Sequence, residues 1–165
     1  MDRFIYNQRT HNTGQLRYGL LSSAATGCGW IAVYNALLLL GKFASPESLI
    51  RYFRVHNLAL GGTLGTDVFA PAVFFHKKGY KVKIYKDLRK FDAAAAAAKA
   101  SLLWYHWRQG YKMGAHFVAL HKKDGEFIGY NTYKNSVGPD RYGPSLREYI
   151  LRQKWRLAVL ITIEE

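Results

Sequence analysis

The stretch TGCGWIAVYNALLLLG, residues 26–41, contains the only cysteine of the chain, Cys28, between two glycines. Apolar residues follow at helical spacing, and Gly41 is a typical residue at a helix end, so the stretch predicts a buried helix from Cys28 to Leu40. Free N–H groups at a helix start lower the pKa of a thiol and favour a nucleophile. Free cysteines are, however, among the most buried residues, so a packing role stays open.

Beyond this helix, the pattern changes from helical to strand-like at about residue 80. Two more helices are predicted over 45–53 and 67–78, and two short ones over 92–98, with Asp92 as its cap, and from 145. Strands are predicted over 80–85, 102–107, 116–121, 126–133 and 155–163. Helices followed by mostly adjacent strands indicate an α+β fold, with an antiparallel sheet and helices packed to one side. No repeat or linker divides the sequence, so residues 1–165 are expected to form one domain.

Local signals support several of these elements. Asp124-Gly125 predicts a tight hairpin between two strands. Ser145 followed by Glu148 matches a capping box, and Ser45-Pro46 is typical of a helix start. In the strand over 80–85, alternation predicts outward lysines and an inward Val82 and Ile84.

The composition limits the classes of function. The 165 residues include 24 Lys and Arg against 11 Asp and Glu, a formal net charge of +13, which favours an anionic partner. The basic residues are scattered, and neither an RNA-binding aromatic signature nor zinc-finger spacing accompanies them. The balance therefore favours an acidic peptide or protein and disfavours nucleic acid as the partner.

Other classes are excluded by missing patterns. No apolar run approaches the ~20 residues that a membrane span needs, and MDRFIYNQRT lacks a signal-peptide core. We therefore expect a cytoplasmic protein without a membrane span. A single cysteine excludes an intrachain disulfide, and no His or carboxylate spacing predicts a metal site. The glycine-rich LGGTLGTD, 60–67, lacks the Lys-Ser/Thr ending of a phosphate loop, so no cofactor is expected.

A nucleophilic cysteine needs a base, and His116 is the histidine in the most suitable context. It opens a predicted strand after the small pair Gly-Ala, so its imidazole can face a cleft. Across a tight hairpin, Asn131 lies near the level of His116, as a polar residue in the apolar strand FIGYNTY. The Asn131 amide could orient the imidazole, although a strand-end asparagine is the commoner case. Cys28, His116 and Asn131 are thus predicted as nucleophile, base and orienter.

Two segments, GCGWIAVYNAL (27–37) and GAHFVALHKKDGEFIGYNTY (114–133), resemble the papain-like cysteine peptidase superfamily. The pattern is closest to the bacterial branch that includes peptidase domains of bacteriocin-processing transporters. In that branch the resemblance implies a catalytic Cys-Gly at a helix start, a Gly-His before alternating apolar residues, and an Asp or Asn beyond it. Cys28, His116 and Asn131 match these positions. The resemblance implies a papain-like fold and hydrolysis of a peptide or protein amide bond through a thioacyl intermediate, with transfer to an amine left open.

The sequence departs from this branch in two places. Asn131 stands where the branch has an acidic orienter. The family also has a Gln or similar oxyanion donor about six residues before its cysteine, where this chain has Ser22 beside Ser23; the nearest upstream glutamine is Gln15. Gln15, Ser22 and Ser23 are therefore the oxyanion candidates, and losing one such donor costs on the order of 10²–10³ in rate. Two alternatives stay open: a catalytically inactive papain-like domain that binds a peptide or partner, and a basic nucleic-acid-associated protein.

Overall fold

The computed structural model describes residues 4–56, 58, 65–155 and 157–165. Its centre is a six-stranded sheet in the order β3-β8-β4-β5-β6-β7, in which all neighbouring strands are antiparallel. The strands are β3 (Lys81–Tyr85), β4 (Ala100–Gln109), β5 (Lys112–Lys123), β6 (Glu126–Tyr130), β7 (Asp140–Gly143) and β8 (Leu157–Glu164). A separate hairpin pairs β1 (Arg17–Tyr18) with β2 (Leu21–Ser22).

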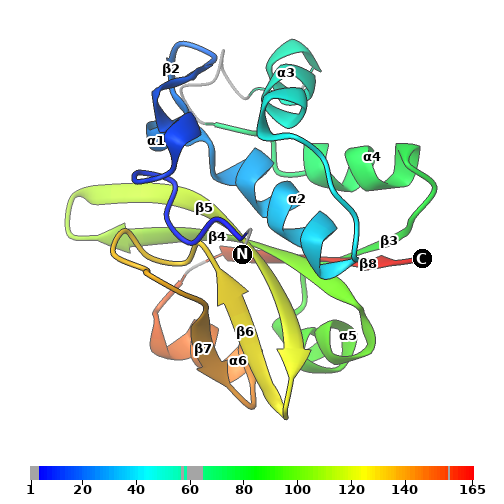
Figure 1. Cartoon of the computed structure of the whole chain (residues 1–165). Coiled ribbons are helices and arrows are strands. Elements are labelled where there is room, and N and C mark those ends of the chain that lie inside the picture. Colours follow the sequence, from blue (N-terminus) through cyan, green and yellow to red (C-terminus); the bar gives the residue numbers. More distant parts are fainter. Residues whose placement is uncertain (1–3, 57, 59–64, 156) are drawn as a thin grey trace.

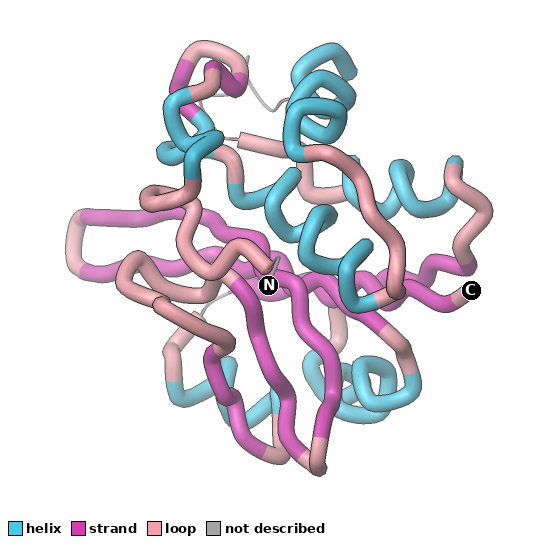
Figure 2. Tube along the Cα trace, in the orientation of Figure 1, coloured by secondary structure: helices cyan, strands magenta, loops and turns pink. Residues whose placement is uncertain are grey.

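Helices cover both faces of this sheet (Figure 1). On one face lie α2 (Cys28–Leu39), α3 (Pro46–His56) and α4 (Ala70–Lys77), and on the other lie α5 (Phe91–Ala97) and α6 (Leu146–Arg152). The tube in Figure 2 shows the same two helical layers with the strands between them.

The prediction that the helices pack to one side is therefore wrong. Neighbouring residues of one strand, such as Leu102 and Leu103 in β4 or Phe117 and Val118 in β5, are all fully or almost fully buried. Because successive side chains of a strand point to opposite faces, both faces of these strands are apolar and both need a cover. Two separate buried clusters result, one containing Leu102 and Phe117 and the other Leu103 and Val118.

Local signals fixed several boundaries as predicted. Helix α3 begins at Pro46, with the Ser45 hydroxyl accepting the Ser48 N–H at 3.2 Å. The Ser145 hydroxyl accepts the Glu148 N–H at 3.2 Å, so the predicted cap of α6 is confirmed. Between β5 and β6, Asp124 and Gly125 have φ of 51° and 84°, as a primed hairpin turn requires.

Other local predictions are wrong, because contacts with distant parts of the chain, or their absence, determine these positions. Asp92 does not cap its own helix, because its carboxylate accepts the Ser145 hydroxyl (2.7 Å) and the Arg147 N–H (3.0 Å) at the start of α6. Ile84 is 43% exposed rather than inward, since β3 is an edge strand of the sheet. Strand β7 had no predicted counterpart. The glycine-rich stretch discussed above falls largely in 59–64, outside the described residues.

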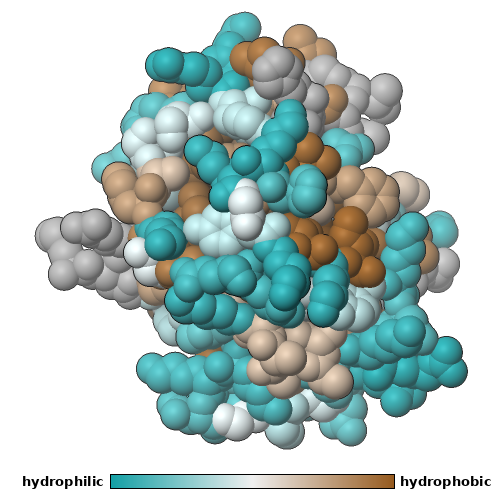
Figure 3. Space-filling model, turned by 90° about the vertical axis from the view of Figure 1, so that its right-hand side faces the viewer, coloured by the Kyte–Doolittle hydropathy of each residue, from teal (hydrophilic) through white to brown (hydrophobic). Residues whose placement is uncertain are grey.

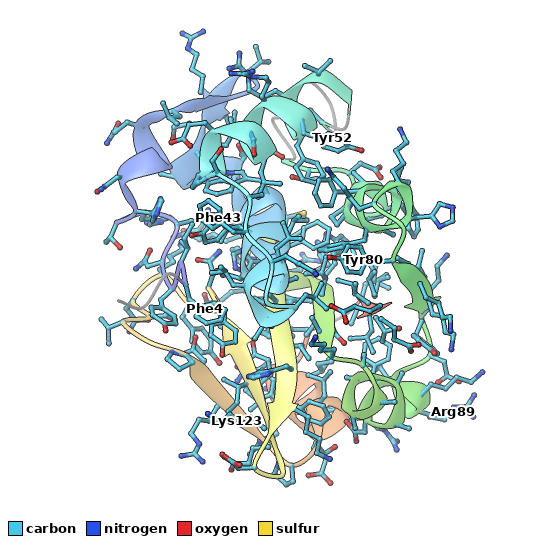
Figure 4. The ribbon with its side chains drawn as sticks, turned by 45° about the vertical axis from the view of Figure 1, so that its right-hand side comes forward. Phe4, Phe43, Tyr52, Tyr80, Arg89 and Lys123 are labelled. Atoms are coloured by element: carbon cyan, nitrogen blue, oxygen red, sulfur yellow. The ribbon has the colours of Figure 1, made fainter. Side chains whose placement is uncertain are left out.

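The first described residues, 4–9, form a segment that we call the N-terminal strap. Asn35, fully buried in α2, accepts the Ile5 N–H and donates to the Ile5 carbonyl, both at 2.9 Å. Phe4, labelled in Figure 4, lies at the start of the strap. Its ring stacks on that of Tyr130 of β6, with centroids 4.3 Å apart. The strap therefore connects the first helical layer to the end of strand β6.

No described helix has the length and apolarity that crossing a bilayer demands. On the side that carries α4 and β3, hydrophobic surface gathers at mid-height with hydrophilic side chains around it (Figure 3). Exposed apolar side chains of this region include Phe69, Val73 and Ile84.

Candidate active site

Cys28 is the first residue of α2, after the short helix α1 (Ser23–Thr26) and Gly27. The next residue must be a glycine, because a Cβ on Gly29 would lie 2.1 Å from Oγ1 of Thr66. That same Oγ1 is hydrogen-bonded to the Tyr18 hydroxyl at 2.6 Å. Gly29 thus allows Thr66 and Tyr18 to pack directly against the start of the helix that carries the thiol.

The thiol of Cys28 is neutral in this setting. Burial raises its pKa to about 11, although the backbone N–H groups of Phe117, Gly29 and Cys28 itself hydrogen-bond to Sγ and lower the pKa in part. The predicted lowering of this pKa is therefore wrong, because the helix start lies against the sheet rather than open to water. The Phe117 contact also brings Sγ to strand β5, at the residue next to His116.

The imidazole of His116 is neutral as well, and its tautomer is defined. Burial lowers its pKa, while a contact with Asn131 raises it in part. In that contact, Nε2 lies 2.6 Å from the main-chain oxygen of Asn131. A carbonyl can only accept, so Nε2 carries the proton and Nδ1 keeps the lone pair that a general base uses. The edge-on packing against Tyr105, with centroids 5.7 Å apart, further fixes the ring.

Asn131 meets His116 through a different atom from the one expected. It follows β6 with φ of 66°, a left-handed conformation that asparagine tolerates, and this turn aims its carbonyl at the imidazole. Its side chain turns to Gln8, where Oδ1 accepts the Gln8 N–H at 3.0 Å and Nδ2 donates to Gln8 Oε1 at 3.4 Å. The main-chain carbonyl, rather than the side-chain amide, therefore contacts the ring.

The three oxyanion candidates lie in different environments. Gln15 is exposed at the end of the 3₁₀ turn η1 (Asn12–Gln15), and Ser22 is half-buried at the end of β2. Ser23 is fully buried, and its hydroxyl accepts the Trp30 indole N–H at 2.7 Å. None of these three described side chains lines the cavity beside His116.

Gln8 is a residue that the sequence reasoning missed. Its Nε2 donates to the Ala24 carbonyl at 2.9 Å, in α1 just before Cys28, while its other groups bond Asn131. Gln8 therefore bridges the segment leading to Cys28 and the residue that holds His116. The only available signal was a glutamine far upstream of the cysteine, outside the spacing that the family has.

An open cavity of about 940 Å³ adjoins this site. Its walls come from the N-terminal strap, the β4–β5 hairpin, residues 131–135 and residues 153–155. Ala25 and His116 line it, whereas Cys28, half-buried as a whole residue, lies off the described cavity wall. Within the residues that the structure describes, no three His, Cys, Asp or Glu side chains gather as a metal-binding group.

Comparisons with known proteins identify the fold. No family model matches the sequence, and no curated protein matches it. Among solved structures, the chain is similar to the peptidase domain of Streptococcus ComA, described as a bifunctional ABC transporter involved in a quorum sensing pathway. The two share 16% identity with a TM-score of 0.52, over 90% of this chain and 100% of that one. The likeness confirms the predicted papain-like α+β fold.

Proposed function

We propose that this chain, as a single papain-like domain, is a cysteine peptidase that hydrolyses a peptide or protein amide bond. Cys28 is the nucleophile, His116 the base and Asn131 the residue that orients the base. The observation that carries the proposal is the contact of His116 Nε2 with the Asn131 carbonyl at 2.6 Å, which leaves Nδ1 as the basic nitrogen. The N–H of the next residue, Phe117, interacts with Cys28 Sγ and lowers the pKa of the thiol in part. The fold likeness to a peptidase domain supports the same activity.

The reaction starts from a neutral thiol and a neutral imidazole, because both pKa shifts disfavour a resting ion pair. His116 Nδ1 takes the thiol proton as Sγ attacks the carbonyl carbon, and the carbonyl electron pair moves to its oxygen. Collapse of this intermediate expels the amine, which takes the proton from His116 and leaves a thioester on Cys28. His116 Nδ1 then takes a proton from water as the water oxygen attacks the thioester carbon. The C–S bond breaks, the acid leaves, and the proton passes from His116 to Sγ, which restores the thiol. If an amine attacked the thioester in place of water, the acyl group would be transferred to that amine.

The developing oxyanion needs N–H donors. The start of α2 supplies main-chain N–H groups at Cys28 and Gly29, both already directed at Sγ. Gln15, Ser22 and Ser23 are less favourable as the second donor, because none of these three side chains lines the cavity beside His116. Gln8, which lines the cavity and bonds α1 through its amide, is our candidate for that role.

The test is cleavage of a proteome-derived peptide library, with new N-termini identified by mass spectrometry. We expect wild-type protein to generate a defined set of cuts, and Cys28→Ala or His116→Ala to lose about 10³-fold or more of the rate. His121→Ala is the matched control, since His121 lies on the same strand and contacts Tyr130 instead. Cuts that persist in Cys28→Ala, or a folded wild-type protein that cuts nothing, would contradict the proposal.

A second candidate function is a non-catalytic peptide-binding domain of the same fold. The observation that favours it is that Cys28, with its raised pKa, lies off the described cavity wall. This candidate predicts that library peptides bind without being cut, and that Cys28→Ala binds them as tightly as wild type.

A further inference from the structure

The cavity beside His116 carries positive charge without compensation. Four of its lining residues are exposed cations, and none of its described lining residues is a carboxylate: the cations are Arg9, Arg108, Lys134 and Lys154. The ion pairs of the described chain are formed by Arg89, Lys99 and Arg141, all elsewhere. The cations of the cavity are therefore available to an anionic ligand.

Aromatic side chains form fixed walls between these cations. Trp155 stacks on Tyr105 with centroids 3.5 Å apart and planes 3° from parallel. Trp107 lies across Gly114, where an added Cβ would come 2.8 Å from the indole ring. Both indoles line the cavity and are half-buried, so each offers part of its surface to a ligand.

We propose that this cavity binds an acidic stretch of the peptide substrate, with Asp or Glu carboxylates at Arg108 and Lys154 and apolar side chains on the indoles. The inference rests on the proposed function insofar as the occupant is the substrate. Two observations support the proposal. The positive charge of the cavity complements acidic side chains, and a peptide bound in the cavity lies beside His116, the proposed base.

A peptide fits this cavity better than a nucleic acid does. The four cations come from four separate segments around one cavity, whereas a phosphate backbone is bound by a basic stripe or patch along its length. His116 and Asn131 also line the cavity, so a peptide bound there lies beside the proposed base.

The test uses the full chain with Cys28→Ala, so that binding is measured without turnover. Calorimetry compares an unlabelled peptide that alternates Asp or Glu with Leu or Phe against the same peptide with Asn and Gln at the acidic positions. We expect the acidic peptide to bind about tenfold more tightly at low salt, with the difference shrinking as salt rises.

Charge reversal then locates the effect. Arg108→Glu with Lys154→Glu should abolish the acidic preference, while Arg54→Glu with Lys123→Glu should retain it. The control pair changes the net charge by the same amount on exposed residues elsewhere, Arg54 in α3 and Lys123 at the tip of the β5–β6 hairpin (Figure 4). Circular dichroism melts of both double variants verify that each is folded.

The possible outcomes distinguish the subsite from the peptidase activity. Equal losses of affinity for the acidic peptide in the two double variants would show a diffuse charge effect and overturn the subsite. A single-stranded oligonucleotide that displaces the bound peptide at a lower concentration than free acidic peptide does would also overturn it. Library cleavage by wild type with no preference for acidic residues would also overturn it, leaving the peptidase intact. Conversely, selective binding with no cleavage of the same peptides would support the subsite and count against the peptidase.

Discussion

Burial acts in opposite directions on the two titratable groups of the candidate site. It raises the pKa of the Cys28 thiol to about 11 and lowers that of the His116 imidazole below its usual 6.5. Over the range between these values, both groups are uncharged. The catalytic proton must then move during attack, unlike in a site where thiolate and imidazolium form before the substrate arrives.

The first prediction follows from these shifts. Because the thiolate forms only as pH approaches about 11, alkylation of Cys28 by iodoacetamide should keep rising from neutral pH through that value. Rates would be followed by intact mass, with glutathione as a free thiol and Cys28→Ala as a blank. In the proposed peptidase, kcat/KM should fall as pH drops through the lowered pKa of His116, which must be neutral to act. An alkylation plateau reached below pH 7 would show a resting ion pair instead.

The second prediction concerns Asn131, whose carbonyl holds His116 while its side chain bonds Gln8. Glycine adopts the φ of 66° freely, whereas alanine in the left-handed region costs roughly 1–2 kcal/mol. We expect Asn131→Gly to retain a larger share of kcat and thermal stability than Asn131→Ala, although both lose the Gln8 contacts. Equal and large losses of kcat, with unchanged melting temperatures, would assign the orienting role to the side-chain amide.

At the scale of elements, the site depends on how closely the start of α2 packs on its neighbours. Gly29→Ala should destabilise the protein by about 1–3 kcal/mol, because the added Cβ cannot share space with Thr66 Oγ1 at 2.1 Å. Thermal melts would measure the loss, and Gly138→Ala is the control, since a Cβ there meets nothing within 4 Å. A neutral Gly29→Ala would mean that Thr66 moves away at little cost.

Element boundaries were predictable where a local rule sets them. Pro46, Ser145 and Asp124-Gly125 each act within a few residues, so sequence alone located two helix starts and a hairpin turn. The layers were less predictable, since which face of a strand a helix covers depends on distant segments. For Asn131, the sequence predicted one property and not another. The hairpin predicted that Asn131 lies near His116, but nothing local predicted the left-handed turn that directs its carbonyl to the ring.

On the scale of the whole molecule, the N-terminal strap joins the parts that form the site. It is anchored on α2 by Asn35, and Asn7 Nδ2 donates to the Lys134 carbonyl at 2.6 Å. Between these anchors, Gln8 contacts both Ala24 and Asn131. The strap thus joins helix α1, just before Cys28, to residues 131–134, which contact His116 through Asn131. Its residues precede both segments in sequence, which explains why motif spacing alone could not reveal Gln8.

The last prediction tests this coupling with Asn35→Leu. The change removes both hydrogen bonds to Ile5, and each main-chain group left buried and unsatisfied costs about 1–3 kcal/mol. We expect a lower melting temperature and faster amide exchange across the strap. Gln8→Ala should be milder for stability, because its bonds are only partly buried, yet should reduce kcat, since it frees Asn131. Asn12→Ala, at an exposed position, is the control. If Asn35→Leu lowers stability while exchange in the strap stays slow, the strap is held by its other contacts, and Asn35 serves the core of α2 alone.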